Sequence, residues 1–185
     1  CSSLEEIKYP STIEKIDCYA FKGCEKLRKF VIPSTFKTIK MGIFYGCSSL
    51  TSIKIPSSVE IIESDAFNSC QSLKEIIFED QSSLKSIRNN AFSVCSSLET
   101  INIPESVKII GPFCFFGCIK LNEITLPAID KIDDNVFDGC ISLNRYSIPQ
   151  SVKSIKSFAF NKCFYLTEII IPPSVTSIKK YAFYC

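Results

Sequence analysis

Cysteine is the residue in this chain whose abundance and spacing could carry chemistry. There are 11 Cys among 185 residues, and eight of them recur at intervals of 22 to 25 residues. Paired thiols can form disulfides, and converging thiolates can hold zinc. Each recurring Cys has a Leu three positions later, which indicates one position of a repeat. The recurring residues are Cys1, Cys24, Cys47, Cys70, Cys95, Cys118, Cys140 and Cys163.

The repeat leaves two states open for these thiols. Strands of a parallel sheet lie about 4.7–4.9 Å apart, so equivalent Cys in stacked units would have Cα atoms near the short end of the disulfide range. Disulfides between neighbours are therefore geometrically allowed. The simpler interpretation is that one inward-facing Cys per unit supplies a small buried apolar group. We predict reduced, structural thiols.

A metal site is not expected from the sequence. Zinc thiolates need ligands that converge tetrahedrally at about 2.3 Å, whereas a column of Cys is linear. The sequence has no His and no Cys-x-x-Cys, and Cys114 with Cys118 is its only close Cys pair. We predict no metal ligands and no cofactor.

Catalytic groups are equally scarce in the sequence. The lack of His removes the commonest general base and nucleophile activator. The six Gly form no phosphate-cradling cluster. The adjacent acids Glu5-Glu6 and Asp133-Asp134 fit a solvated surface. We therefore predict no catalytic residues and no enzyme activity.

The charge balance argues against two classes of partner. The chain carries 21 Lys and Arg against 19 Asp and Glu, a net charge of +2. This balance gives no reason to expect binding to nucleic acid or to an anionic membrane. No apolar run approaches the roughly 20 residues that span a bilayer, so no membrane span is predicted. Charge does vary along the chain, with acidic residues gathered at 130–138 and Lys at 153–180.

The rest of the repeat indicates the elements that must position these Cys. Aligned units read Cys-x-x-Leu-x-x-Ile-x-Ile-Pro-x-Ser-Val-x-x-Ile-x-x-x-Ala-Phe-x-x-Cys. The two apolar residues before Pro predict one short strand per unit, and Pro ends it because it cannot donate to a ladder. The second apolar pair predicts a short extended or 3₁₀ return segment, since its β-branched content disfavours a helix. The strand pairs are Ile7/Tyr9, Phe30/Ile32, Ile53/Ile55, Ile76/Phe78, Ile101/Ile103, Ile124/Leu126, Tyr146/Ile148 and Ile169/Ile171.

A Phe near the end of each unit predicts an aromatic spine through the core. Eight of the 15 Phe occupy this position, and each stacked ring would bury about 150–250 Å². Gly23, Gly46, Gly117 and Gly139 precede recurring Cys, where a positive φ would help to turn the chain. The spine residues are Phe21, Phe44, Phe67, Phe92, Phe115, Phe137, Phe160 and Phe183.

The unbroken repeat predicts a single solenoid domain over residues 1–185, with about eight units that begin at the recurring Cys. Two units are irregular, because two residues are added at Glu79–Ser83 and one is missing between Leu126 and Ile132. Insertions in solenoids often lie on a binding face, so Glu79–Ser83 is an alternative binding surface. Neither end carries the polar cap that solenoids need, so we expect an excerpt of a longer chain.

This pattern resembles the repeat of BspA-like leucine-rich repeat proteins, which have units of about 23 residues. The resemblance rests on Leu-x-x-Ile-x-Ile-Pro followed by Val-x-x-Ile-x-x-x-Ala-Phe-x-x-Cys, and it covers essentially all of residues 1–185. It implies a curved, β-rich leucine-rich repeat solenoid with a parallel sheet on its concave face. It also implies a surface or secreted protein of bacteria or parasitic protists that takes part in adhesion, without a shared catalytic site.

Strand alternation predicts where a partner would bind. The residues on either side of the first strand Ile lie on the face opposite the core, and solenoids commonly bind through such sheets. We expect these residues to tile one continuous sheet, which has no large aromatic anchor. The predicted protein-binding residues are Glu6, Lys8, Lys29, Lys54, Glu75, Glu123, Arg145 and Glu168.

Two functions remain open at this point. The first is a non-enzymatic, adhesin-like module, on the cell surface or secreted, that binds host or cell-surface proteins through the concave sheet. The alternative is a structural or spacer module in the cytoplasm, with no binding site in this segment. Reduced thiols and the lack of any Asn-x-Ser/Thr favour the alternative.

Overall fold

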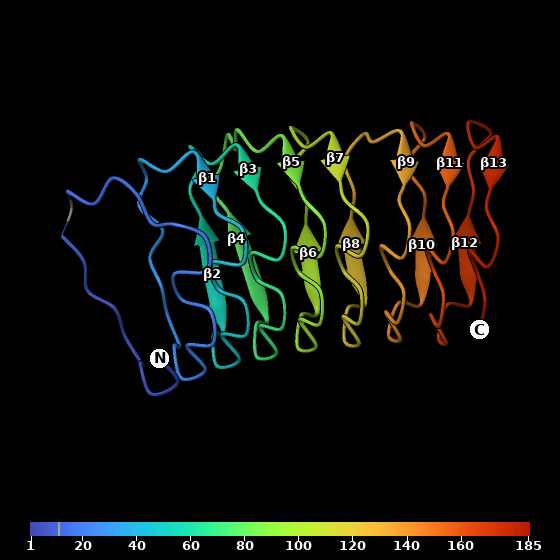
Figure 1. Ribbon diagram of the computed structural model, residues 1–185. Coiled ribbons are helices and arrows are strands. Elements are labelled where there is room, and N and C mark those ends of the chain that lie inside the picture. The colour runs from blue at the N-terminus through green and yellow to red at the C-terminus, as the bar shows by residue number, and fades with distance from the viewer. Residues whose placement is uncertain (11) are drawn as a thin grey trace.

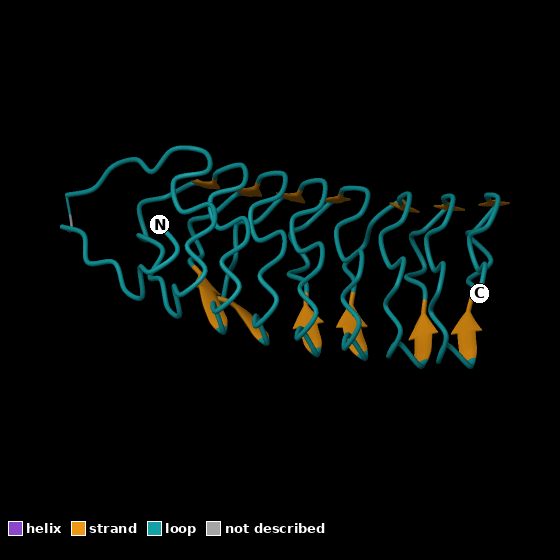
Figure 2. Ribbon diagram, turned by 60° about the horizontal axis from the view of Figure 1, so that its bottom comes forward, coloured by secondary structure: helices purple, strands orange, loops and turns teal. Residues whose placement is uncertain are grey.

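The computed structural model describes residues 1–10 and 12–185, and the chain winds through them as a series of stacked coils (Figure 1). Figure 2 shows short strands in two rows joined by loops, and no helix occurs in the described residues. The strands are β1 (Thr38–Ile39), β2 (Ser52–Ile55), β3 (Ile61–Ile62), β4 (Glu75–Phe78), β5 (Ser86–Ile87), β6 (Thr100–Asn102), β7 (Ile109–Ile110), β8 (Glu123–Thr125), β9 (Lys131–Ile132), β10 (Arg145–Ser147), β11 (Ser154–Ile155), β12 (Glu168–Ile170) and β13 (Ser177–Ile178).

The strands belong to two sets that alternate along the chain. Each Cys–Leu segment from Cys47 onward leads into a long strand, and these strands (β2, β4, β6, β8, β10 and β12) build what we call the long-strand face. The two-residue return strands follow the Pro turns, and the odd-numbered strands β1 to β13 build the return face. Every strand pair is parallel, with Ile53 of β2 opposite Ile76 of β4, for example. A parallel β-solenoid with extended return segments is therefore confirmed.

Pairing is less continuous than the repeat predicts. The long strands form three separate ladders, β2–β4, β6–β8 and β10–β12. The return strands form a ladder of four, β1-β3-β5-β7, and a ladder of three, β9-β11-β13. The prediction of one continuous sheet is wrong, because no ladder joins β4 to β6 or β8 to β10 in the described residues.

The first two units also depart from the prediction of one strand per unit. The segments around Ile7 and Phe30 contain no strand. Of the backbone hydrogen bonds among the described residues, one joins these two segments, from the Arg28 N–H to the Glu5 carbonyl at 3.3 Å. A single bond cannot build a ladder, and Figure 1 shows the N-terminal end opening out.

Both rows of strands break where one residue is missing from the repeat. A regular Pro turn is closed by the N–H three residues later, as from Val107 to the Pro104 carbonyl at 3.0 Å. In the shortened turn, the Ile129 N–H reaches the Pro127 carbonyl only two residues earlier, at 2.9 Å. No ladder joins β7 to β9 or β8 to β10 in the described residues. We attribute this seam to the shorter path, which displaces the next coil.

Stacked Phe rings occupy the centre of the core, as the sequence predicts. Successive spine rings have centroids 5.2–5.8 Å apart and interplanar angles of 6–25°. The six inner rings, from Phe44 to Phe160, are fully buried, whereas Phe21 and Phe183 are partly buried. The spine crosses the seam between Phe115 and Phe137 without interruption.

Two left-handed residues in each unit turn the chain around the spine. Gly23, Gly46, Gly117 and Gly139 have φ of 67–76°, which confirms the role predicted for them. A second left-handed position lies two residues before each spine Phe, with φ of 55–60°. The sequence does not reveal this second position through glycine, because most units have a larger residue there. This position comprises Tyr19, Gly42, Asp65, Asn90, Phe113, Asn135, Phe158 and Tyr181.

Candidate functional site

Seven of the eight recurring Cys, from Cys24 to Cys163, form a buried column along the coils. From Cys47 onward each thiol donates a hydrogen bond of 3.2–3.3 Å to a spine Phe carbonyl of the neighbouring coil. The sequence interpretation of Cys as a purely apolar group misses this bond. The pairs are Cys47–Phe21, Cys70–Phe44, Cys95–Phe67, Cys118–Phe92, Cys140–Phe115 and Cys163–Phe137.

Burial keeps these thiols protonated. Desolvation raises the pKa of Cys47 and of Cys118 from the ordinary value of 9.0 to about 12. A protonated thiol is a poor nucleophile and a poor metal ligand. All 11 Cys are free thiols, of which Cys1, Cys18 and Cys185 are exposed. Within residues 1–10 and 12–185, no three acidic or Cys side chains are placed to hold a metal ion. The column packs the coils together.

The long-strand face presents its outward side chains as strand alternation predicts. In β6, β8 and β10 the middle residue is buried and its two neighbours are exposed. Three of the predicted binding residues, Glu6, Lys8 and Lys29, are exposed but lie in the first two units, outside any strand. The other five lie on long strands: Lys54 on β2, Glu75 on β4, Glu123 on β8, Arg145 on β10 and Glu168 on β12.

Two ion pairs involve these residues. Arg145 lies opposite Glu168 in the β10–β12 ladder, with the Arg Nε 3.6 Å from the Glu Oε2. The Lys54 Nζ lies 2.9 Å from the Glu79 Oε1. Exposed pairs of this kind contribute little to stability, because solvent and salt screen them, so they leave the face free to exchange partners.

The irregular turn at Glu79–Ser83 is tied back to the preceding coil. Glu79 Oε2 accepts the Ser57 N–H at 3.0 Å, and the Ser83 N–H donates to the Ser57 carbonyl at 2.9 Å. The hydrogen bond from Lys54, followed by that from Ser57, lowers the pKa of the Glu79 carboxyl. Glu79, which stands where most units have Pro, therefore bonds this turn to the preceding coil and gives the turn a structural role.

Three hollows on the long-strand side lie where consecutive coils share no ladder, and another, of about 440 Å³, lies beside Lys54 and Ile77 on the paired strands β2 and β4. One of about 490 Å³ is lined by residues 30–35 with Lys54 and Pro56, before β2. One of about 520 Å³ lies between Phe78 of β4 and Asn102 of β6. One of about 420 Å³ lies between residues 122–126 and 145–150, across the seam of β8 and β10. Breaks in pairing thus account for part of the relief of this face.

Exposed aliphatic residues on two long strands, and Val31 in the coil before β2, were missed by the prediction, which selected charged positions. Val31, Ile77 and Ile170 are 75%, 41% and 55% exposed, and all three occupy the same place in the repeat. The sequence signal that could have identified them is an apolar residue at a position where strand alternation directs the side chain outward. Exposed apolar side chains mark interaction surfaces when they form part of a contiguous patch.

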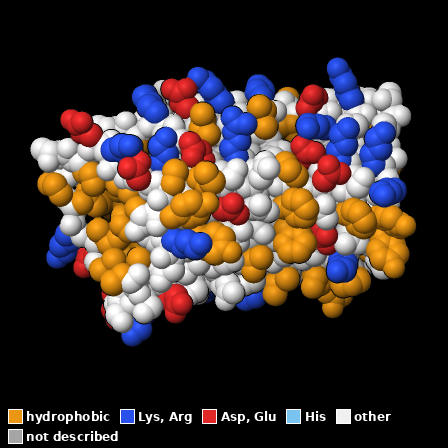
Figure 3. All heavy atoms as spheres, in the orientation of Figure 1, with side chains coloured by type: hydrophobic (Ala, Val, Ile, Leu, Met, Phe, Trp, Pro, Cys, Tyr) orange, Lys and Arg blue, Asp and Glu red, His pale blue; other side chains and the backbone are white. Residues whose placement is uncertain are grey.

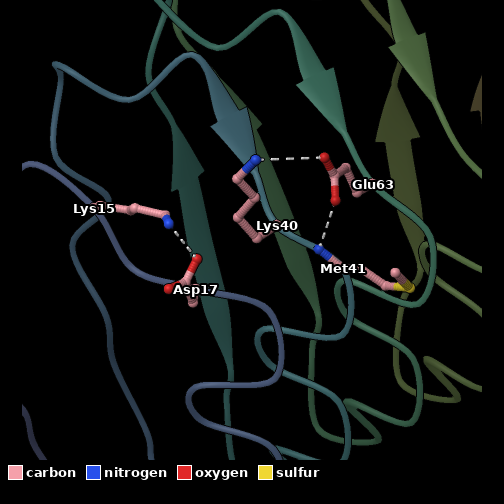
Figure 4. Close-up of polar contacts among 5 residues, drawn as sticks. All are labelled: Lys15, Asp17, Lys40, Met41 and Glu63. Carbon is pink, nitrogen blue, oxygen red and sulfur yellow. Dashed lines mark hydrogen bonds and ion pairs between the residues drawn. The ribbon is translucent and has the colours of Figure 1, made fainter.

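The return face uses its charges differently. Figure 3 shows Lys, Arg, Asp and Glu side chains gathered along the upper edge, where Figure 1 places the return strands, with apolar side chains below them. Figure 4 shows Glu63 accepting the Met41 N–H at 3.0 Å while its other oxygen lies 3.7 Å from the Lys40 Nζ. It also shows the pair of Lys15 and Asp17, at 2.9 Å.

Another return-face pair also joins neighbouring coils. The Lys85 Nζ lies 2.6 Å from Glu60 Oε2, and this hydrogen bond lowers the pKa of the Glu60 carboxyl. The pairs Lys40–Glu63 and Lys85–Glu60 thus join adjacent coils on the return face, as two pairs do on the long-strand face. Glu75 and Glu123 on the long-strand face have no ion-pair partner within residues 1–10 and 12–185.

The repeat seen in the coils matches a known family model. The model for the BspA type leucine rich repeat region matches in six copies, over residues 1–96 and 85–185. The chain belongs to this family. A BspA-type repeat is a structural and interaction module, and no catalytic group accompanies it in the site described above.

Solved structures of other leucine-rich repeat proteins share the BspA-type fold of this chain. A protein from Bacteroides ovatus is 31% identical with a TM-score of 0.84, over 92% of this chain and 46% of that one. The Treponema protein TpLRR (T. pallidum) is 30% identical with a TM-score of 0.71, over 92% of this chain and 71% of that one. The pneumococcal vaccine antigen PcpA is 27% identical with a TM-score of 0.69, over 94% of this chain and 46% of that one.

This BspA-type chain thus spans about half the length of two of these proteins. No curated protein matches it. In the part of the chain that the structure describes, no helix could cross a membrane.

Proposed function

We propose that the long-strand face binds proteins displayed on host or other cells, and that the parent protein acts as an adhesin-like molecule, secreted or on the cell surface. One observation carries the proposal. Six parallel strands bring outward side chains of differing chemistry, among them Lys54, Glu75, Ile77 and Arg145, onto one side of the coil. An extended surface of this kind suits contact with another folded protein.

The proposed location has separate support. The chain is similar to a pneumococcal vaccine antigen, and a location exposed to other cells fits that similarity. Antibody labelling of intact cells that carry the parent protein tests it. We expect labelling without permeabilisation, and labelling that appears only after permeabilisation would contradict a surface location.

The binding function is tested by affinity capture with the parent protein. Wild-type protein is compared with a variant whose long-strand charges are reversed, E75K/E123K/R145E. Because rim charges govern orientation and association rate, we expect the variant to retain at least tenfold less of the captured surface protein.

A return-face variant, K108E/K153E, is the matched control, since both Lys are exposed and make no side-chain ion pair within the described residues. Equal loss in both variants would point to non-specific charge effects. Capture of no protein by the wild type, from either cell-surface or cytosolic extracts, would favour the spacer function.

A further inference from the structure

The hollow before β2 combines apolar walls with open backbone, and we call it the N-terminal groove. It is lined by residues 30–35, Tyr9, Ile13, Lys54, Pro56 and Glu79. Most of these side chains are apolar, and Val31 is 75% exposed, the largest fraction among the exposed large hydrophobic residues of the described chain. A concave surface with mostly apolar walls is the usual form of a site that accepts an apolar side chain.

Backbone groups on the groove side of β2 lack backbone partners. In a parallel ladder, alternate residues direct their N–H and C=O to opposite sides. The backbone groups of Ile55 point toward β4, because the Ile55 carbonyl accepts the Glu79 N–H at 3.0 Å. Ser52 and Lys54 therefore direct their backbone groups toward the groove.

The opposite wall of the groove is open as well. Among the described residues, no backbone hydrogen bond joins segment 30–32 to β2. The nearest such bond, from the Thr51 N–H to the Arg28 carbonyl at 3.4 Å, lies before the strand. Unpaired backbone at a strand edge is the feature that accepts an extended polypeptide, since a polypeptide offers N–H and C=O at matching intervals.

The charges at the groove neutralise one another. Lys54 and Glu79 are its ionised lining residues, and their Nζ and Oε1 lie 2.9 Å apart. The rest of the lining is apolar or hydroxyl-bearing, and the Tyr9 hydroxyl donates to the Val31 carbonyl. A charged ligand side chain would lose its hydration here without gaining a free partner, so an uncharged apolar one fits better.

We propose that an extended segment of a partner protein, with uncharged apolar side chains at alternate positions, docks in the N-terminal groove and pairs its main chain with backbone that the two coils leave open. The inference rests on the proposed binding function of the long-strand face, and it narrows that function to one end of the face and to one class of ligand.

The test uses random peptides displayed on phage and selected on the wild-type protein, followed by synthesis of the enriched sequence. We expect alternating aliphatic or aromatic residues in that sequence. N-methylation of its alternate amides should weaken binding about tenfold or more, because each methyl group removes a main-chain donor. V31D should abolish binding.

The matched control is I170D, which changes an aliphatic residue at the same repeat position and 55% exposed. It should bind the peptide as the wild type does, and thermal unfolding of both variants checks that they remain folded. Binding lost in I170D but kept in V31D would overturn the inference and leave the proposed binding face standing. Binding that survives every long-strand substitution, including E75K/E123K/R145E, would overturn both. No enriched peptide, or one insensitive to N-methylation, would overturn the inference alone.

Discussion

A recurring Cys in this solenoid is fully buried and still donates a hydrogen bond, which an Ala at that position could not do. The Phe67 carbonyl accepts the Cys70 N–H at 3.1 Å and the Cys95 thiol at 3.3 Å. Both lone pairs of that carbonyl are thus used, one within its own coil and one by the next. The thiol therefore links neighbouring coils through a weak hydrogen bond in a buried site.

The buried thiols make stability depend on pH. Their pKa is raised in the folded state, so the folded protein keeps protons that the unfolded chain loses. Their contribution is complete below the unfolded value of 9.0 and is lost as pH rises toward about 12. Urea unfolding at a series of pH values, under reducing conditions, should show the unfolding free energy falling across this window. A C95A/C118A variant should show a shallower fall, and an unchanged slope would contradict this account.

Tyr146 places a hydroxyl in the core without a hydrogen-bond partner among the described atoms. It fills a place where most units have Ile, and its ring lies 5.7 Å from that of Phe137. Removing an unsatisfied buried hydroxyl removes a desolvation penalty, so Tyr146→Phe should raise the unfolding free energy by about 1 kcal/mol. Chemical denaturation measures the change. Tyr165→Phe, at an exposed position, should change little, and a loss of stability in Tyr146→Phe would show that the hydroxyl is bonded.

At the scale of the element, the repeat predicts what lies within a unit better than what joins two units. The strand pairs, the Pro turns and the Phe spine follow from local patterns of apolar spacing and Pro. Ladder continuity depends on the offset between coils, which no single unit encodes. The motif around Phe30 matches that of β2 and forms no strand. The outward charges of the candidate site were predictable from alternation, whereas the hollows were not, because they depend on how neighbouring coils are placed.

The missing residue after Leu126 offers a direct test of the seam. Inserting one Ser between Ala128 and Ile129 restores the length of the unit, so the Pro127 carbonyl can accept from an N–H three residues later. We expect new ladders from β7 to β9 and from β8 to β10. Hydrogen–deuterium exchange should then be slower in residues 123–126 and 145–148. Exchange as fast as in the wild type would mean that the seam has another cause.

The Phe spine should carry much of the stability of the inner coils. Phe92 is fully buried between rings at 5.4 and 5.8 Å, so Phe92→Ala removes two stacking contacts and leaves a cavity. The expected loss is about 3–5 kcal/mol in the unfolding free energy, measured with urea. Phe183→Ala, at a partly buried ring, should cost clearly less. Equal losses at both sites would contradict the stacked-spine account.

Across the whole molecule, the two faces of the solenoid have different tasks. The return face directs carboxylates such as Glu60 and Glu63 toward neighbouring coils, and so helps to hold the stack together. The long-strand face leaves Glu75, Glu123 and the aliphatic Val31 and Ile77 exposed. Because each coil contacts mainly its neighbours, stability and binding can be divided between faces without a common centre.

The central claim is that the long-strand face, and not the return face, contacts the partner. Hydrogen–deuterium exchange of the parent protein, free and bound to the protein captured in the affinity experiment, tests it most directly. We expect binding to slow exchange in β2 to β12 of the long-strand set, most strongly near β2 and β4, and to leave the return strands unchanged. Slower exchange confined to the return strands, with none on the long-strand face, would contradict the claim.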